Sequence, residues 1–369
     1  MPNIMAGSLD GRFAELAADR LEVVSVVVNN VCNLRCKHCY LEPETSHSAL
    51  SHEEWLQVLG SVVEQLQPAV LSFAGKEVFA DRDSVDLLLS TIRLRNSAQS
   101  PAHRRTRIGV ITNGTLLQRY HDKLLSDPPD YIDVSIDGLP SVHDDVRGTG
   151  SFERLEPNLQ WLTQEFKNPV WVTHTLFGTN LASLADFVST LATRHGLRRF
   201  SVGLYHPLSY TDQSLRLRPG RPAHSVERML QRLASIGVPA PVEVVLDLGV
   251  DDTWLFPDLQ RSGLIAFDGP FSSRTRELGN GVSLTVNATR ILTGLWRAVR
   301  ISPQGHWLAS EDLLFPKEYD HRAVTMLREH GCSATAAYRF GLGHLRASIR
   351  SSQAERQSLA REVEPAIAV

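Results

Sequence analysis

Short apolar runs of strand length alternate with longer segments in which apolar residues recur every three or four positions. This alternation extends from the first apolar run, at residue 23, to about residue 237. The predicted strands are Val23–Asn29, Ala69–Phe73, Arg107–Thr112, Tyr131–Ile136, Pro169–Leu176 and Arg199–Tyr205. The predicted helices lie near Ser51–Gln67, Arg82–Arg95, Leu116–Ser126, Phe152–Glu165, Leu181–His195 and His224–Ile236.

Six successive strand–helix units predict an α/β fold with a parallel sheet, either curled into a barrel or opened into a doubly wound sheet. Six units are two fewer than a complete (β/α)8 barrel contains. Beyond Pro241 the alternation stops, and Ser302-Pro303-Gln304-Gly305 predicts a tight turn between two short strands. We therefore expect an N-terminal extension (1–21), a barrel core (22–238) and a smaller α+β extension with a helical tail (239–369).

Composition narrows the classes of function. The chain has a net charge of −3, 42% hydrophobic and 21% charged residues, which is typical of a globular protein with an ample core. Nothing in this balance indicates a nucleic-acid partner. No apolar run reaches the length of a membrane span, and the first twenty residues do not resemble a signal peptide. We expect a cytoplasmic protein without a membrane partner.

Three of the four cysteines fall within eight residues, at Cys32, Cys36 and Cys39, directly after the first predicted strand. Their C-x3-C-x2-C spacing can place three thiolates around an iron–sulfur cluster and leave one iron free of protein ligands, whereas electron-transfer clusters are held by four cysteines. A zinc site completed by His38 or His47 is the alternative. Disulfide pairing is disfavoured, because only Cys332 remains as a partner for three clustered cysteines.

The cysteine motif resembles the signature of the radical S-adenosylmethionine (radical SAM) superfamily. This resemblance implies a partial (β/α)6 barrel that holds a [4Fe-4S] cluster through Cys32, Cys36 and Cys39. It also implies that SAM binds the open iron and is cleaved to a 5′-deoxyadenosyl radical, which abstracts a hydrogen atom from the substrate. An external electron donor such as flavodoxin or ferredoxin would reduce the cluster.

Further motifs resemble those of the family, and each follows a successive predicted strand. Gly75-Lys76-Glu77 resembles the Gly-Gly-Glu element that binds the SAM amino group, with Lys76 in place of the second glycine. By the same resemblance, Asn113 of Thr-Asn-Gly and Ser135 of Ser-x-Asp-Gly are expected to contact SAM. Arg147, in His-Asp-x-x-Arg-Gly, is expected to pair with the SAM carboxylate, with a surface salt bridge as the alternative. Leu204 or Tyr205 is expected to pack near the adenine ring.

The C-terminal part resembles a SPASM or twitch domain that has lost the cysteines of an auxiliary cluster, because only Cys332 lies there. Since such clusters accept an electron in relatives, we expect a redox-neutral reaction, with epimerisation favoured over elimination, rearrangement or decarboxylation. Epimerisation needs a hydrogen donor, and Cys332 is the candidate, with Tyr205 second. The alternative for Cys332 is a small buried residue.

Polar-capable aromatic residues at strand ends and in the extension favour a sugar- or nucleoside-like small molecule as substrate. A ribosomally made peptide is the second possibility. A zinc-binding module or a ferredoxin-like carrier would leave the motifs after the second, third and fourth strands unexplained. A divalent metal site at His143, Asp144 and Asp145 is a further alternative, disfavoured because adjacent side chains rarely converge on one ion.

Overall fold

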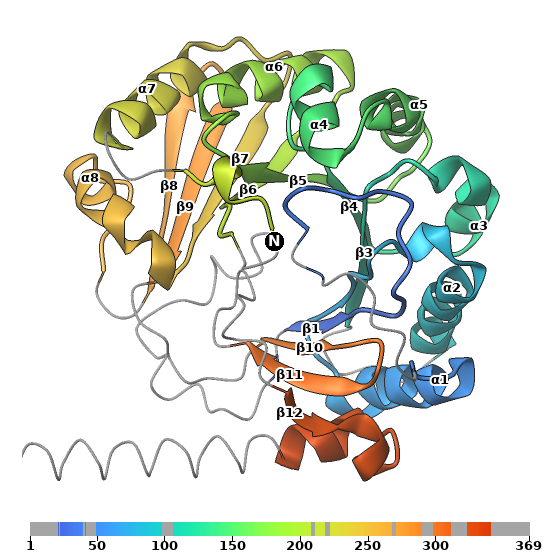
Figure 1. Cartoon of the computed structure of the whole chain (residues 1–369). Coiled ribbons are helices and arrows are strands. Elements are labelled where there is room, and N and C mark those ends of the chain that lie inside the picture. Colours follow the sequence, from blue (N-terminus) through green and yellow to red (C-terminus); the bar gives the residue numbers. More distant parts are fainter. Residues whose placement is uncertain are drawn as a thin grey trace, which may run out of the picture.

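The computed structural model describes residues 21, 23–39, 41, 49–97, 106–207, 211–217, 222–267, 271–289, 298–310 and 323–340. Its described strands form one curved sheet with helices on the outer side (Figure 1). The strands are β1 Val23–Val26, β2 Val70–Phe73, β3 Arg107–Thr112, β4 Tyr131–Ser135, β5 Val170–Leu176, β6 Arg199–Leu204, β7 Val242–Leu248, β8 Phe271–Gly279, β9 Val282–Thr289, β10 Ala298–Ile301, β11 His306–Ser310 and β12 Ala323–Met326.

The helices are α1 His52–Ser61, α2 Arg82–Ser97, α3 His121–Ser126, α4 Pro140–Arg147, α5 Ser151–Gln164, α6 Leu184–Arg194, α7 Pro222–Ser235 and α8 Phe256–Arg261. A further helix covers residues 334–340. Ser51 caps α1: the Glu54 amide donates to the Ser51 hydroxyl at 3.2 Å, and the Ser51 amide donates to the Glu54 carboxylate at 2.7 Å. This reciprocal arrangement satisfies amides that would otherwise lack partners at the helix start.

Strands β1 to β7 lie side by side in chain order, and each pairs in parallel with the next. The sheet order is β12-β11-β10-β1-β2-β3-β4-β5-β6-β7-β9-β8. β10 extends the sheet in parallel beside β1, and β9 does so beside β7. The strands β8, β11 and β12 pair antiparallel with their neighbours.

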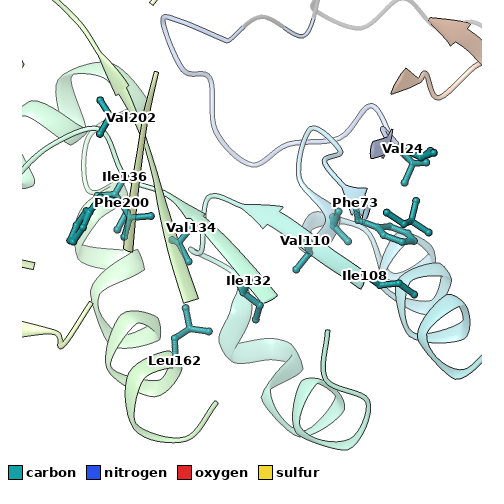
Figure 2. Packing of buried hydrophobic residues seen from close by; sticks show 14 of the residues in the cluster. Val24, Phe73, Ile108, Val110, Ile132, Val134, Ile136, Leu162, Phe200 and Val202 are labelled. Carbon is teal, nitrogen blue, oxygen red and sulfur yellow. The ribbon is translucent and has the colours of Figure 1, made fainter. Parts of the chain in front are cut away.

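The apolar core lies between the sheet and the outer helices. Alternate residues of each parallel strand, such as Val110, Val134 and Phe200, are fully buried in it (Figure 2). Because successive side chains of a strand point to opposite faces, the intervening residues face the inside of the curve. Helices therefore cover the outer face of the sheet, whereas the other side chains of each strand line its inner face.

The α/β architecture with a parallel barrel-like core confirms the fold predicted from the sequence. The predicted turn at Ser302–Gly305 is confirmed as the connection between β10 and β11. Two elements were not predicted in this form. β7 continues the parallel sheet beyond residue 238. α4 lies in a segment for which no helix was predicted: Pro140 is a favoured residue at its first position, but its two turns are too short for a clear apolar period.

No helix among the described residues combines the length and the apolar character that a membrane crossing requires.

Phe200 on β6 is fully buried, whereas Phe340 in the helix over 334–340 is 50% exposed. Replacement of Phe200 by alanine is expected to lower the free energy of unfolding by about 3–5 kcal/mol, because it removes buried apolar surface and leaves a cavity. Phe340→Ala is the matched control and should change stability by less than about 1 kcal/mol. Chemical denaturation followed by circular dichroism measures both. Equal effects would contradict the placement of Phe200 in the core.

Candidate active site

The predicted site residues gather at the edge where the parallel strands end. The cysteine loop (residues 31–39) follows β1, and Glu77, Asn113 and Asp137 follow β2, β3 and β4. In Figure 1 the segment after β1 crosses the inside of the curve before it reaches α1. Carboxyl ends of parallel strands are where loops converge and where ligands bind in α/β folds. The motifs that follow one another along the chain thus lie at one edge of the sheet.

The three cysteines of the loop are half-buried thiols with polar neighbours. The amide of Leu34 donates to Cys32 Sγ at 3.4 Å, and Asn113 Nδ2 lies 3.9 Å from the same sulfur. Burial raises the pKa of Cys36 to about 11, although the nearby Arg147 guanidinium acts in the opposite direction. The Cys36 thiol therefore stays protonated until a metal displaces the proton. N–H donors directed at a sulfur are typical of cluster ligands, whose potential they tune.

This donor set fits an iron–sulfur cluster better than zinc. Among the residues that the structure describes, no three His, Cys, Asp or Glu side chains converge closely enough to hold one ion. Zinc needs its ligands around a single point, whereas a cubane spreads its thiolates over separate irons. His38, proposed above as a zinc ligand, instead directs Nε2 to Asp137 at 3.4 Å. His47 lies outside the described residues.

Glu77 joins the loops after β1, β2 and β3. Its carboxylate is buried, with 1% of the residue exposed, and accepts hydrogen bonds from the Thr112 hydroxyl at 2.8 Å and the Asn113 amide at 2.7 Å. Its own amide donates to Val31 O at 3.0 Å. Burial raises its pKa. The carboxylate also accepts from the Phe79 amide at 3.1 Å. Since a carboxylate offers about four lone-pair positions, these three contacts leave one for a ligand amino group.

Asn113 fixes the cysteine loop from the other side. Its Nδ2 donates to Asn33 Oδ1 at 3.0 Å, and its Oδ1 accepts from the Thr115 amide at 2.9 Å. The following residue, Gly114, has φ +75°, and a Cβ there would lie 2.4 Å from Leu155 Cδ1. Only glycine satisfies both the backbone angle and the space. The Thr-Asn-Gly element is thus a structural turn that holds an amide beside the cysteines.

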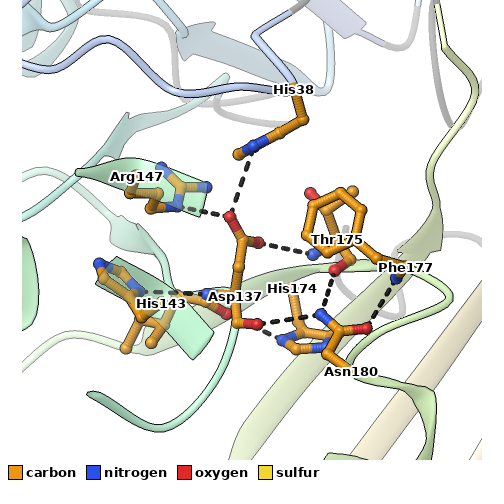
Figure 3. Close-up of polar contacts among 9 residues, drawn as sticks. His38, Asp137, His143, Arg147, His174, Thr175, Phe177 and Asn180 are labelled. Atoms are coloured by element: carbon orange, nitrogen blue, oxygen red, sulfur yellow. Dashed lines mark hydrogen bonds and ion pairs between the residues drawn. The ribbon is translucent and has the colours of Figure 1, made fainter. Parts of the chain in front are cut away.

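Asp137 is the centre of a buried polar network (Figure 3). One carboxylate oxygen accepts from Arg147 Nε at 2.6 Å and faces His38 Nε2 at 3.4 Å, and the other accepts from the Thr175 amide at 2.9 Å. Its backbone amide donates to His143 Nδ1 at 3.3 Å. Burial opposes ionisation of Asp137, but the Arg147 guanidinium outweighs it and holds the pKa of this carboxyl well below its usual range.

Arg147 is therefore neither a surface salt bridge nor a free cation. Its side chain is 9% exposed, and Nε is occupied by Asp137. Its Nη atoms have no hydrogen-bond partner among the described residues, which leaves the other edge of the guanidinium for an anion.

The triplet His143, Asp144 and Asp145 does not form a metal site. Asp144 accepts from the amides of Gly150 and Phe152 at the start of α5, and Asp145 pairs with Lys37 at 2.7 Å. His143 is turned toward the Asp137 amide. The three side chains thus have separate partners.

The remaining predicted site residues differ in how close they lie to the cysteine loop. Tyr205 is buried beside it: its ring is 6.4 Å from that of His38, and its hydroxyl lies 2.6 Å from Thr211 Oγ1. Ser135 is half-buried at the end of β4, and Gly75 is half-buried in the loop after β2. Leu204 packs against the outer apolar core.

Cys332 lies in the outer apolar layer. It is 6% exposed and belongs to the core cluster, and the amide of nearby Ala334 donates to Ser61 Oγ at the end of α1. In Figure 1 this segment lies outside β10–β12 beside α1, away from the cysteine loop. The placement favours the alternative interpretation of Cys332 as a small buried residue.

The inner face of the sheet is polar along β4 to β9. Thr173 donates to the buried Asp133 at 2.7 Å, and Asp247 accepts from Ser201 at 3.2 Å and from Asn287 at 2.8 Å. Burial raises the pKa of both aspartates. The interior of a closed (β/α)8 barrel is usually filled by branched apolar residues. A polar wall in that position is suited to a polar ligand.

Sequence analysis considered His38 and His143 only as metal ligands and did not predict that they, together with His174, lie around Asp137. His174 Nδ1 lies 2.9 Å from Ile136 O, beside the Asp137 network. The available signal was the position of His38 between two of the motif cysteines, and the alternation in β5 that places His174 on the buried outer face. Motif spacing does not show which carboxylate a histidine will face.

The chain was compared with known proteins. Residues 26–192 match the sequence profile of the family described as "Radical SAM superfamily". The chain is 28% identical over 149 residues to the Fe-coproporphyrin III synthase of Methanosarcina barkeri (39% of this chain, 35% of that protein). It is 26% identical over 168 residues to the sporulation killing factor maturation protein SkfB of Bacillus subtilis (45% and 38%). It thus spans little more than a third of the length of these curated relatives.

Among solved structures, native anSMEcpe with bound AdoMet and Kp18Cys peptide has the same fold. The TM-score is 0.56 at 14% identity, with 86% of this chain and 80% of that chain covered.

The buried His143 imidazole is expected to make the stability of the protein depend on pH. Burial lowers its pKa to about 4, whereas an unfolded histidine titrates near 6.5. The unfolded state therefore binds more protons between these values, so stability falls as pH is lowered from about 6.5 to about 4, by roughly 3 kcal/mol from this residue. His143→Gln should remove that part of the pH dependence in urea titrations. Replacement of the exposed His52 is the control, and an identical pH profile for His143→Gln would contradict the assignment.

Proposed function

We propose that residues 26–192, which match the radical SAM family, act as a radical SAM domain and that Cys32, Cys36 and Cys39 hold its [4Fe-4S] cluster. When bound, the cluster and SAM supply a 5′-deoxyadenosyl radical that abstracts a substrate hydrogen. The three thiols on one loop, at the ligand-binding edge of the sheet, carry this proposal. The proposed cluster is reduced by an external donor such as flavodoxin or ferredoxin.

We propose that SAM binds across the loops after β2, β3 and β4. Glu77 and the Gly75 carbonyl receive its amino group, and Asn113 and Ser135 contact its ribose and methionine part. Arg147 contributes its Nη edge to the SAM carboxylate, because Nε is already bound to Asp137. Leu204 lies against the outer core, so Tyr205 is the better placed residue for the adenine end.

The polar inner wall supports a sugar- or nucleoside-like substrate. Thr173, Ser201 and Asn287 present hydroxyl and amide groups on the same face as the buried carboxylates of Asp133 and Asp247. Ligands rich in hydroxyl groups need such convergent polar contacts. We propose a redox-neutral conversion of such a molecule, with epimerisation favoured over elimination or decarboxylation.

A peptide is the second candidate substrate. SkfB is a maturation protein of the sporulation killing factor, and the similar anSMEcpe structure holds a peptide. These likenesses favour a ribosomally made peptide. Side chains such as Ser, Thr or Asn would suit the same polar wall.

Epimerisation requires a hydrogen donor on the face opposite to abstraction. Tyr205 is adjacent to the cysteine loop, whereas Cys332 lies behind the sheet. We therefore propose Tyr205 ahead of Cys332 for this role. The Tyr205 hydroxyl also lies 3.0 Å from the Asp212 carbonyl, which holds it in place.

Replacement of Cys32, Cys36 or Cys39 by alanine should abolish cluster assembly and SAM cleavage, because each thiolate binds one iron. After anaerobic reconstitution, iron per chain and 5′-deoxyadenosine formed with dithionite measure the two effects. Cys332→Ala is the matched control and should retain about four irons per chain and SAM cleavage. A Cys36→Ala variant that keeps the cluster and cleaves SAM would refute the assignment.

The substrate class can be tested with deuterated candidates. Holoenzyme is incubated with SAM and perdeuterated sugar nucleotides, nucleosides or peptides, and mass spectrometry detects deuterium in 5′-deoxyadenosine. We expect transfer from a sugar or nucleoside. Transfer only from peptides would select the second candidate. With an accepted substrate in D2O, Tyr205→Phe should stop deuterium incorporation at the reacting carbon, whereas Cys332→Ala should not. The reverse result would restore Cys332 as the donor.

A further inference from the structure

The cysteine loop is attached to the end of α4 by contacts at Lys37 and His38, which stand between Cys36 and Cys39. The Lys37 amide donates to Val146 O at 2.9 Å, and its side chain pairs with Asp145 at 2.7 Å. His38 faces Asp137, which in turn holds Arg147 at the last position of α4. The segment between the second and third cysteines is thus joined to one short helix.

These contacts differ greatly in burial. The Lys37–Asp145 pair is open to solvent, with 42% and 62% of the side chains exposed. The carboxylate of Asp137 is fully buried, and its partners Arg147 and His38 are 9% and 11% exposed. Exposed ion pairs fix geometry weakly, whereas a buried charge must keep its partners. The Asp137 side of the attachment is therefore the one that can enforce a single loop position.

His38 is also confined from its other side. Its ring meets Phe177 edge-on at 5.3 Å between centroids and Tyr205 at 6.4 Å. The Lys37 carbonyl accepts from the Asp212 amide at 3.1 Å. Both backbone groups of residue 37 therefore have protein partners that do not require a bound ligand. The same holds for Nε2 and the ring edge of His38, whereas its buried Nδ1 has no hydrogen-bond partner among the described residues.

We propose that Asp137 and Arg147 are positioning residues that hold the Cys36–Cys39 segment in its cluster-binding arrangement before any iron is bound. This inference rests on the proposed function of the three cysteines. Asp137 acts through His38, and Arg147 acts by keeping Asp137 ionised and oriented. Side chains that orient metal ligands from the second layer commonly change metal affinity by about 10- to 100-fold when they are replaced.

As a positioning residue, Arg147 has a role that is separate from SAM binding. As a SAM carboxylate partner alone, Arg147 would affect SAM affinity and leave iron binding unchanged. As a positioning residue, it affects the loop in protein without iron and without SAM. The two roles therefore differ in measurements that need no substrate.

The test compares Asp137→Asn with Asp145→Asn, which makes the same chemical change in the exposed partner of Lys37. In iron-free protein we measure how fast iodoacetamide alkylates Cys36 and Cys39, by peptide mass spectrometry. After reconstitution we measure iron per chain against a competing chelator. Asp137→Asn should alkylate faster than wild type and bind iron roughly 10-fold more weakly. Asp145→Asn should match wild type in both measurements.

A double variant separates positioning from mere loss of stability. Asp137→Asn leaves Arg147 buried without its counter-charge, so the thermal midpoint should fall. Asp137→Asn combined with Arg147→Gln removes both charges and should recover much of the midpoint while alkylation stays fast and iron binding stays weak. Recovery of iron binding together with the midpoint would overturn the proposal.

Arg147→Lys keeps the positive charge, and it replaces Asp137→Asn as the test variant if Asp137→Asn does not fold. We expect it to give intermediate alkylation rates, since an ammonium cannot reproduce the Nε contact. Wild-type alkylation and iron content with weakened SAM binding would overturn the proposal and leave the SAM role. Failure of wild-type protein to bind iron would instead refute the proposed function, while the alkylation comparison would still report on the loop.

Discussion

The arrangement of the site depends on the separation of the two faces of a parallel sheet. Alternate side chains of β1 to β7 pack against the outer helices and exclude water, and this burial supplies the apolar core of the protein. The inner face of the sheet can therefore carry polar side chains. Parallel strands also end at one edge, so loops far apart in the chain are brought together there. The polar inner wall and the loops at the strand ends both depend on this helix-covered outer layer.

At the edge where the strands end, two buried acidic residues, Glu77 and Asp137, join neighbouring loops. Glu77 binds the turn after β3 through its carboxylate and the start of the cysteine loop through its backbone amide. The Asp137 carboxylate binds Arg147 of α4 and the Thr175 amide of β5, and it faces His38 in the middle of the same loop. Removal of such a group from water is costly unless its partners are present. Each carboxylate therefore favours one arrangement of its neighbours, and residues outside the cysteine loop constrain its start and its middle.

The sequence could predict the parallel core, the turn at Ser302–Gly305 and the motif loops, because these follow from periodicity, turn chemistry and spacing. It could also place Cys32, Glu77 and Asn113 at one edge, since each comes directly after a strand. It could not predict α4, whose two turns are too short to show a clear apolar period. Nor could it predict that His38 faces Asp137 or that Cys332 lies behind the sheet, because such contacts are set by packing between distant segments.

The curved sheet does not close on itself among the described strands, since β8 and β12 stand at its two ends. An open edge offers unpaired backbone groups to any strand of another molecule. Along β8, Arg274, Arg276 and Glu277 are exposed, so charge recurs where a second chain would have to approach. The incomplete barrel thus brings a risk of aggregation that a closed one avoids, and the charged edge strand reduces that risk without shielding the inner face.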